Sequence, residues 1–121
     1  MKPIDIQSKF QSFEEHWTPK IVGELNGQYV KLAKLKGEFV WHSHEHEDEL
    51  FMVIKGTLHM HFRDRTEIVT EGEMIVVPRG IEHFPVTEHN EEVWVMLFEP
   101  MHTKHTGEIV HERTVEQQDW I

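Results

Sequence analysis

The middle of the chain alternates between apolar and polar residues with a period of two, which is typical of β-strands. Asn26-Gly27 is the strongest local turn signal, because a type I′ hairpin turn needs positive φ at both of its central positions. Gly56, Gly72 and Gly80 mark further turns. We expect strands at Tyr29–Leu35, Glu38–His44, Leu50–Lys55, Thr57–Arg63, Thr66–Thr70, Met74–Val77, Ile81–Val86 and Val93–Phe98. Many short strands at close spacing predict an all-β barrel or sandwich.

Helical patterns are confined to the two ends. Phe10, Phe13 and Trp17 are spaced as on one face of a short helix, which Pro19 should end, and this face should cover an open side of the barrel. Near the other end, the run Thr114 to Gln117 matches a capping box and predicts a short helix ending at Trp120 and Ile121. We expect one domain spanning residues 1–121.

Composition excludes several classes of partner. The 22 acidic and 12 basic residues give a formal net charge of -10, which argues against binding to nucleic acid or to anionic membranes. The longest apolar run, Leu50 to Ile54, is too short to cross a bilayer. The chain has no cysteine, so disulfides and thiolate metal sites are excluded, and it shows no apolar signal segment. These features fit a protein of the reducing cytoplasm.

Histidines and one glutamate form the main candidate for chemistry. His42 and His44 are two residues apart, so on an extended chain they project to the same side. Glu49 follows after four residues, and His83 lies in a second turn-rich stretch. Imidazole nitrogens combined with a carboxylate oxygen suit a first-row divalent metal.

At these residues the chain resembles the cupin family. The usual first motif, G-x5-H-x-H-x3-4-E-x6-G, is matched by His42, His44, Glu49 and Gly56. Only four residues separate Gly37 from His42, where the motif has five. The usual second motif is G-x5-P-x-G-x2-H-x3-N. It is matched by four residues, with Thr87 in place of the asparagine: Gly72, Pro78, Gly80 and His83.

The resemblance implies a jelly-roll barrel, also called a double-stranded β-helix, with the metal-binding motifs at residues 37–56 and 72–87. It implies one divalent transition metal (Fe, Mn, Ni, Co or Zn) held by the residues that match the family's ligands: His42, His44, Glu49 and His83. One or two coordination positions would stay open for water or substrate.

The family's range of activities leaves the function open. Its members include dioxygenases, decarboxylases, sugar isomerases and epimerases, and also non-catalytic binding domains. We therefore expect a metal-dependent enzyme of oxygenase or isomerase type acting on a small organic substrate. The alternative is a non-catalytic metal-containing binding or sensing module. Arg63, Arg65 and Arg79 all lie near turns, which weakens a sugar-phosphate isomerase.

Other histidines offer weaker alternatives. His46 could form a ligand pair with His44, but only two residues would then separate this pair from Glu49, too few for a turn. We therefore expect His46 to be a solvated loop residue. His59 and His61 alternate with Leu58, Met60 and Phe62, which should face the core, so both imidazoles should face outward.

The same alternation predicts an apolar outer face. Phe51 and Val53 share the parity of Glu49 and should point inward. The opposite parity sends five apolar side chains outward: Phe39, Trp41, Leu50, Met52 and Ile54. A patch of this kind needs a cover. We expect a homodimer, and the N-terminal helix is the competing cover.

Overall fold

The computed structural model describes residues 1–103, 105–107 and 117–121. The described part contains one short helix, α1 (Ile6–Gln11), followed by strands that occupy much of the chain. The strands are β1 (Lys20–Leu25), β2 (Gln28–Leu35), β3 (Glu49–Lys55), β4 (Leu58–Phe62), β5 (Thr66–Val69), β6 (Met74–Val77), β7 (His83–Val86) and β8 (Val93–Pro100). The expected all-β architecture is confirmed. The helix is too short and too polar to cross a membrane, and no other helix is found in the described residues.

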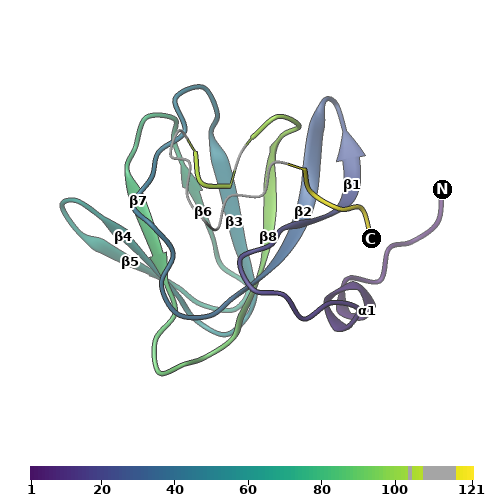
Figure 1. Ribbon diagram of the computed structural model, residues 1–121, viewed down its shortest axis with the longest axis horizontal. Coiled ribbons are helices and arrows are strands. Elements are labelled where there is room, and N and C mark those ends of the chain that lie inside the picture. Colours follow the sequence, from purple (N-terminus) through teal and green to yellow (C-terminus); the bar gives the residue numbers. More distant parts are fainter. Residues whose placement is uncertain (104, 108–116) are drawn as a thin grey trace.

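The strands form two antiparallel sheets (Figure 1). One sheet has the order β1-β2-β8-β3-β6, and the other has the order β5-β4-β7. Side chains from the inner faces of both sheets fill a common core, among them Val53, Leu58, Met60 and Val95, each with no exposed surface. The predicted type I′ turn joins β1 to β2, with positive φ at both Asn26 and Gly27.

The expected strand at Glu38–His44 is wrong. This segment meets its neighbour at only two isolated bridges, Glu38 with Val86 and His42 with His83. The chain between these two points runs without a continuous ladder. Residues 38–44 have a strand-like sequence, but their backbone hydrogen bonds to residues 80–85 fall at Phe39, His42 and His44 without the regular repeat of a ladder.

The N-terminal helix begins and ends earlier than predicted. Asp5 caps it, because its side chain accepts a hydrogen bond from the N–H of Ser8 at 3.2 Å, and the helix ends at Gln11. Phe13 and Trp17 are buried but follow the helix. Trp17 instead enters the main core, where its ring stacks on Phe39 at 4.8 Å.

The predicted C-terminal helix starts at residues that lie outside the described part of the chain. Its expected end is not helical, because residues 117–121 are extended or irregular. Trp120 forms a bridge with Ile21, and the N–H of Ile121 donates to the carbonyl oxygen of Ile21 at 3.0 Å. The terminus therefore ends alongside β1.

The outer face of the five-stranded sheet is apolar, with two corrections to the prediction. Phe39 is buried between the sheets and does not face outward. Trp41 stacks on Phe84 of β7, in the three-stranded sheet, with ring centroids 5.4 Å apart. Leu50, Met52 and Ile54 do alternate with buried neighbours on β3, as expected. The helix residue Phe10 and the following Phe13 cover part of this face, in a cluster that includes Ile54.

Candidate metal centre

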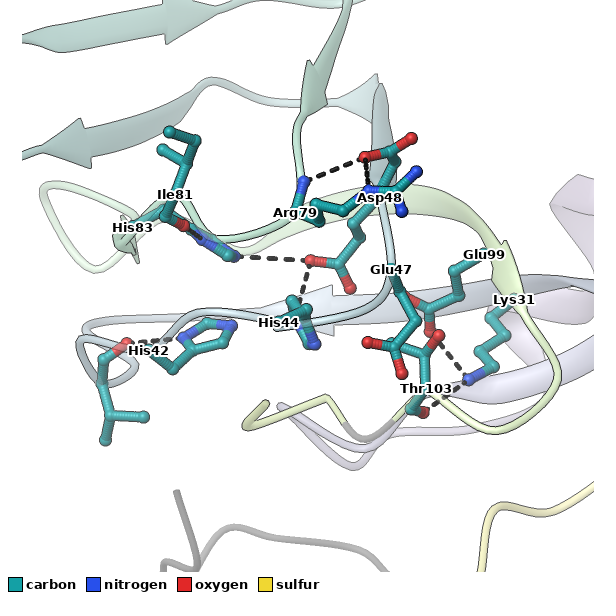
Figure 2. A network of polar contacts seen from close by, with 12 residues as sticks. Lys31, His42, His44, Glu47, Asp48, Arg79, Ile81, His83, Glu99 and Thr103 are labelled. Carbon is teal, nitrogen blue, oxygen red and sulfur yellow. Dashed lines mark hydrogen bonds and ion pairs between the residues drawn. The ribbon is translucent and has the colours of Figure 1, made fainter. Parts of the chain in front are cut away.

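The four residues singled out in the sequence come together inside the barrel. His42 and His44 lie in the segment before β3, Glu49 is the first residue of β3, and His83 is the first residue of β7. All four are nearly inaccessible to solvent, with exposed fractions of 3%, 3%, 2% and 0% in that order. One donor atom from each lies within 4.8 Å of all the others. Figure 2 shows the three imidazoles gathered from two separate segments.

Backbone pairing holds the two histidine segments together. The N–H of His42 donates to the carbonyl oxygen of His83 at 3.1 Å, and the N–H of His83 donates to that of His42 at 2.9 Å. This pair of hydrogen bonds joins the two motifs, which are about forty residues apart in the sequence. A single two-residue bridge therefore sets the distance between the imidazoles of His42 and His83, whose ring centroids are 4.2 Å apart.

Hydrogen bonds at Nδ1 orient two of the rings. Nδ1 of His42 lies 2.9 Å from the carbonyl oxygen of Val40, and Nδ1 of His83 lies 2.9 Å from that of Ile81. A carbonyl oxygen only accepts, so in the neutral rings the proton sits on Nδ1. The unprotonated Nε2 atoms are then free to act as ligands, an arrangement common in metal-binding histidines.

Two polar atoms at the centre are poorly satisfied. Nε2 of His83 and Oε1 of Glu49 are buried without a well-formed hydrogen bond. The glutamate oxygen lies 3.3 Å from Nε2 of His44 and 3.4 Å from Nε2 of His83. Leaving such atoms unpaired is costly, and a shared cation would satisfy both. Two ligands of one transition metal lie at most about 4.4 Å apart, so the donor set fits an ion with small adjustments.

The electrostatics of the centre favour neutral imidazole and charged carboxylate. Burial, together with the neighbouring His83, lowers the pKa of His42 to about 3. Burial raises the pKa of Glu49, but hydrogen bonding with Glu99 and the imidazoles outweighs it and holds the pKa well below its ordinary value. The metal-free protein therefore already holds both groups in the protonation states that coordination requires.

Sequence reasoning missed a second charged pair beside the centre, Lys31 and Glu99. Lys31 and Glu99 are 1% and 0% exposed, and Lys31 Nζ lies 2.7 Å from Glu99 Oε1. Burial and the charge of Glu49 raise the pKa of Glu99, while Lys31 opposes the rise. The signal was the parity of the two residues, since Lys31 shares the parity of Ala33 on β2 and Glu99 shares that of Leu97 on β8.

A cavity of about 30 Å³ adjoins the centre. Its wall is mostly apolar and includes the rings of Trp17, Phe39 and Phe51. Three polar residues also line it: the candidate ligands His42 and Glu49, and His105, which sequence reasoning left unassigned. The ring of His105 lies 5.4 Å from that of Phe39.

The chain after β8 closes over this cavity. Thr103, His105 and Thr106 are buried. Gly107 approaches so closely that a Cβ atom there would overlap the carbonyl group of Ser43, between the candidate ligands His42 and His44. Only glycine allows this contact, and it brings residues 105–107 against the segment that carries these two histidines.

The weaker candidates stay outside the centre. His46 is exposed, with its nearest carboxylate on Glu45 at 3.8 Å. His59 and His61 face away from the core, where Nδ1 of His61 lies 2.6 Å from the hydroxyl of Thr66. Arg79 is a turn residue whose N–H donates to Asp48 at 2.9 Å, as Figure 2 shows.

Comparison with known proteins agrees with this architecture. The family description "Cupin domain" matches residues 28–99, more than half of the chain. A crystal structure of a cupin-2 domain containing protein from Shewanella frigidimarina NCIMB 400 is similar at 44% identity. That match has a TM-score of 0.77 and covers 80% of this chain and 93% of that one. Protein NMB1881 from Neisseria meningitidis is similar at 29% identity, with a TM-score of 0.74, over 82% of this chain and 99% of that one.

A curated relative is similar over a shorter stretch. The uncharacterized protein YdbB of Bacillus subtilis (strain 168) is 36% identical over 63 residues, which is 51% of this chain and 56% of that protein. The chain thus spans little more than half the length of this relative. From its strand order, its buried cluster of three histidines and a glutamate, and a family match over residues 28–99, this chain belongs to the cupin family.

Proposed function

We propose that this protein binds one divalent transition metal (Fe, Mn, Ni, Co or Zn) and uses it as an enzyme on a small organic substrate. His42, His44, Glu49 and His83 would be the ligands. Their convergence supports the assignment, as do Nε2 of His83 and Oε1 of Glu49, which are buried without a well-formed hydrogen bond. The proposed chemistry is of oxygenase or isomerase type.

One observation carries the proposal of catalysis. The cavity lies against two of the proposed ligands, His42 and Glu49, and contains a further polar side chain, His105. A binding pocket with apolar walls and a few convergent polar groups is the usual form of a small-molecule site. Its volume of about 30 Å³ has room beside the ligands for a group of about the size of one or two water molecules.

The residues around the cavity would have different roles in binding and catalysis. When bound, a divalent ion supplies an electrophile with open positions for water or substrate. The aromatic wall excludes water and favours an apolar substrate body. Nδ1 hydrogen bonds keep His42 and His83 in one orientation. His105 is the lining residue outside the ligand set that can exchange a proton with a bound substrate.

The second candidate function is a non-catalytic binding or sensing module. The composition of the cavity wall favours it, because, among the described residues and beyond the two proposed ligands, the lining is apolar except for His105. An apolar wall can hold a ligand beside the metal without supplying an acid or a base.

Turnover separates the two functions. Protein loaded with Fe(II) should consume oxygen with one member of a panel of small organic compounds, or NMR should show that a panel member has isomerised. His105→Phe, which keeps the metal ligands and fills the cavity, should bind metal as wild type does and lose turnover. Binding of a panel compound without turnover at any loaded metal would favour the sensing module.

We also propose that a second copy of this chain covers the outer face of β3 and β6. On β6, Met74 and Val76 are 62% and 51% exposed. Their register partners on β3 are Met52 and Leu50, so the four side chains form one continuous apolar patch. The helix cluster covers Ile54 at one end of β3 and does not include these four. A symmetric pairing would bury the same patch on both copies.

The cytoplasm is the proposed location. The absence of cysteine among all 121 residues fits a reducing compartment. Cell fractionation with an antibody to the protein would test this proposal, and recovery in an oxidising compartment would contradict it.

A further inference from the structure

Two buried carboxyl groups lie opposite each other across the junction of β3 and β8. Leu50 pairs with Phe98 in the antiparallel register, so the preceding Glu49 stands opposite the following Glu99. Both side chains point into the barrel and are at most 2% exposed. One of them is a proposed metal ligand, and the other lies opposite it on the neighbouring strand, with its side chain buried on the same inner face.

A lysine holds the second carboxyl group in place. Lys31 extends from β2, and its Nζ lies 2.7 Å from Glu99 Oε1 and 3.5 Å from the backbone oxygen of Thr103 (Figure 2). The side chain is 1% exposed, so the ammonium group is removed from water. This lysine contacts both the partner of Glu49 and the chain segment that covers the cavity.

A pair of this kind contributes little to stability. The desolvation of two buried charged groups offsets most of their attraction, and apolar side chains of similar volume often serve stability equally well or better. The barrel interior around Lys31 and Glu99 is otherwise built from such side chains, including Ala33, Val95 and Leu97. Stability alone therefore does not account for a lysine and a glutamate at these positions.

We propose that Lys31 and Glu99 are positioning residues that hold the carboxylate of Glu49 in the orientation needed to bind metal. The inference rests on the proposed metal-binding function and adds residues that the family motifs do not contain. Glu99, opposite Glu49 on the neighbouring strand, restricts the rotation of the Glu49 carboxylate. Lys31 keeps Glu99 against Glu49 and, through Thr103, ties the covering segment to the same point. Contacts of this type beside metal ligands commonly change metal affinity by about 10–100-fold.

The test replaces the pair by apolar residues of similar size, Lys31→Met together with Glu99→Leu. The dissociation constant for Co(II) is measured by competition with a chromophoric chelator, the visible absorption of the Co(II) protein is recorded, and the unfolding temperature of the metal-free protein is determined. We expect the affinity for Co(II) to fall by about 10–100-fold with an altered absorption spectrum. The unfolding temperature should equal or exceed that of wild type. Wild-type affinity and spectrum in the double variant would overturn the proposal.

Lys34→Met is the matched control. Lys34 lies on the same strand and is also buried, but its Nζ donates to the backbone oxygen of Phe13 at 2.6 Å, on the helix side of the sheet. Its removal should change stability and leave the affinity for Co(II) at the wild-type value. An equal loss of affinity in this control would show a general effect of removing a buried ammonium group, and would overturn the proposal.

Glu99→Gln gives an independent test that does not depend on the folding of the double variant. The amide keeps the size of the side chain but changes its contact with both Lys31 and Glu49, so the Co(II) spectrum should shift. A wild-type spectrum and affinity would overturn the positioning role. The proposed metal function fails separately, in the case where the wild-type protein itself binds no Co(II).

Discussion

The hydroxyl oxygen of Thr87 accepts a hydrogen bond from the N–H of Gly37 at 2.6 Å, and the N–H of Thr87 donates to the carbonyl oxygen of Gly37 at 2.8 Å. These are the two positions at which the chain departs from the usual cupin motifs, one in spacing and one in residue type. The two departures therefore meet in one contact. It joins Gly37, which follows β2 and has a φ of +84°, to Thr87, which directly follows β7.

Thr87→Val should destabilise the protein by about 1–2 kcal/mol, because the valine keeps the shape and leaves the N–H of Gly37 without its acceptor. Urea unfolding of the metal-free protein measures the change. Thr87→Ser retains the hydroxyl group and should lie closer to wild type. Equal stability of the valine variant and wild type would mean that the backbone bond alone holds the contact.

His44→Ala should abolish stoichiometric metal in the purified protein, because it removes one of four converging donors. Elemental analysis beside wild type measures the loss. His46→Ala is the control, since this imidazole lies two residues away and is 79% exposed. Metal retained in the His44 variant at the wild-type level would exclude His44 from the ligand set.

The stability of the metal-free protein should fall as the pH drops below about 6.5. The unfolded chain protonates His42 near pH 6.5, whereas the folded chain does so only near pH 3. The unfolded state therefore binds more protons throughout this window. For this group alone, stability falls by about 1.4 kcal/mol for each pH unit within it. Burial and the charge of Glu49 raise the pKa of Glu99, and this group opposes the trend in part.

NMR titration of the His42 ring isolates its contribution. The chemical shift of the metal-free protein should stay that of a neutral imidazole from pH 7 to about pH 4. His42→Gln should reduce the acid dependence of unfolding measured in urea. A ring that titrates near pH 6.5 in the folded protein would contradict the prediction.

Met52→Glu should convert the proposed dimer to a monomer, because the charge would enter the patch formed with its register partner Met74. Light scattering at several protein concentrations measures the change, and the metal content should be unaffected. Ile68→Glu provides the control, because Ile68 is also exposed, at 58%, but lies on β5 in the other sheet. A wild-type protein that is monomeric at high micromolar concentration would refute the dimer.

The ligand set and most strands could be predicted from the sequence because both are local properties. Alternation within β3 already separates Phe51 and Val53, which point inward, from Leu50 and Met52, which point outward. The spacing of His42 and His44 marked a pair that projects to one side, and the resemblance to the cupin motifs completed the candidate set with Glu49 and His83. The turn at Asn26-Gly27 follows from the φ angles that these two residues tolerate.

Tertiary structure decided the features that depend on partners distant in the sequence. Alternation at residues 38–44 predicts a strand, but a strand also needs a continuous ladder with a neighbour, and this segment forms two isolated bridges instead. Phe39, which the parity of His42 alone would place outside, is buried with its ring stacked on that of Trp17. Lys31 and Glu99 look like solvent-facing charges in the sequence, and His105 looks like one of many scattered histidines. They become parts of the site because β2, β3 and β8 align in register and the chain after β8 places His105 in the cavity wall. Pairing and closure of this kind are fixed only when the whole barrel assembles.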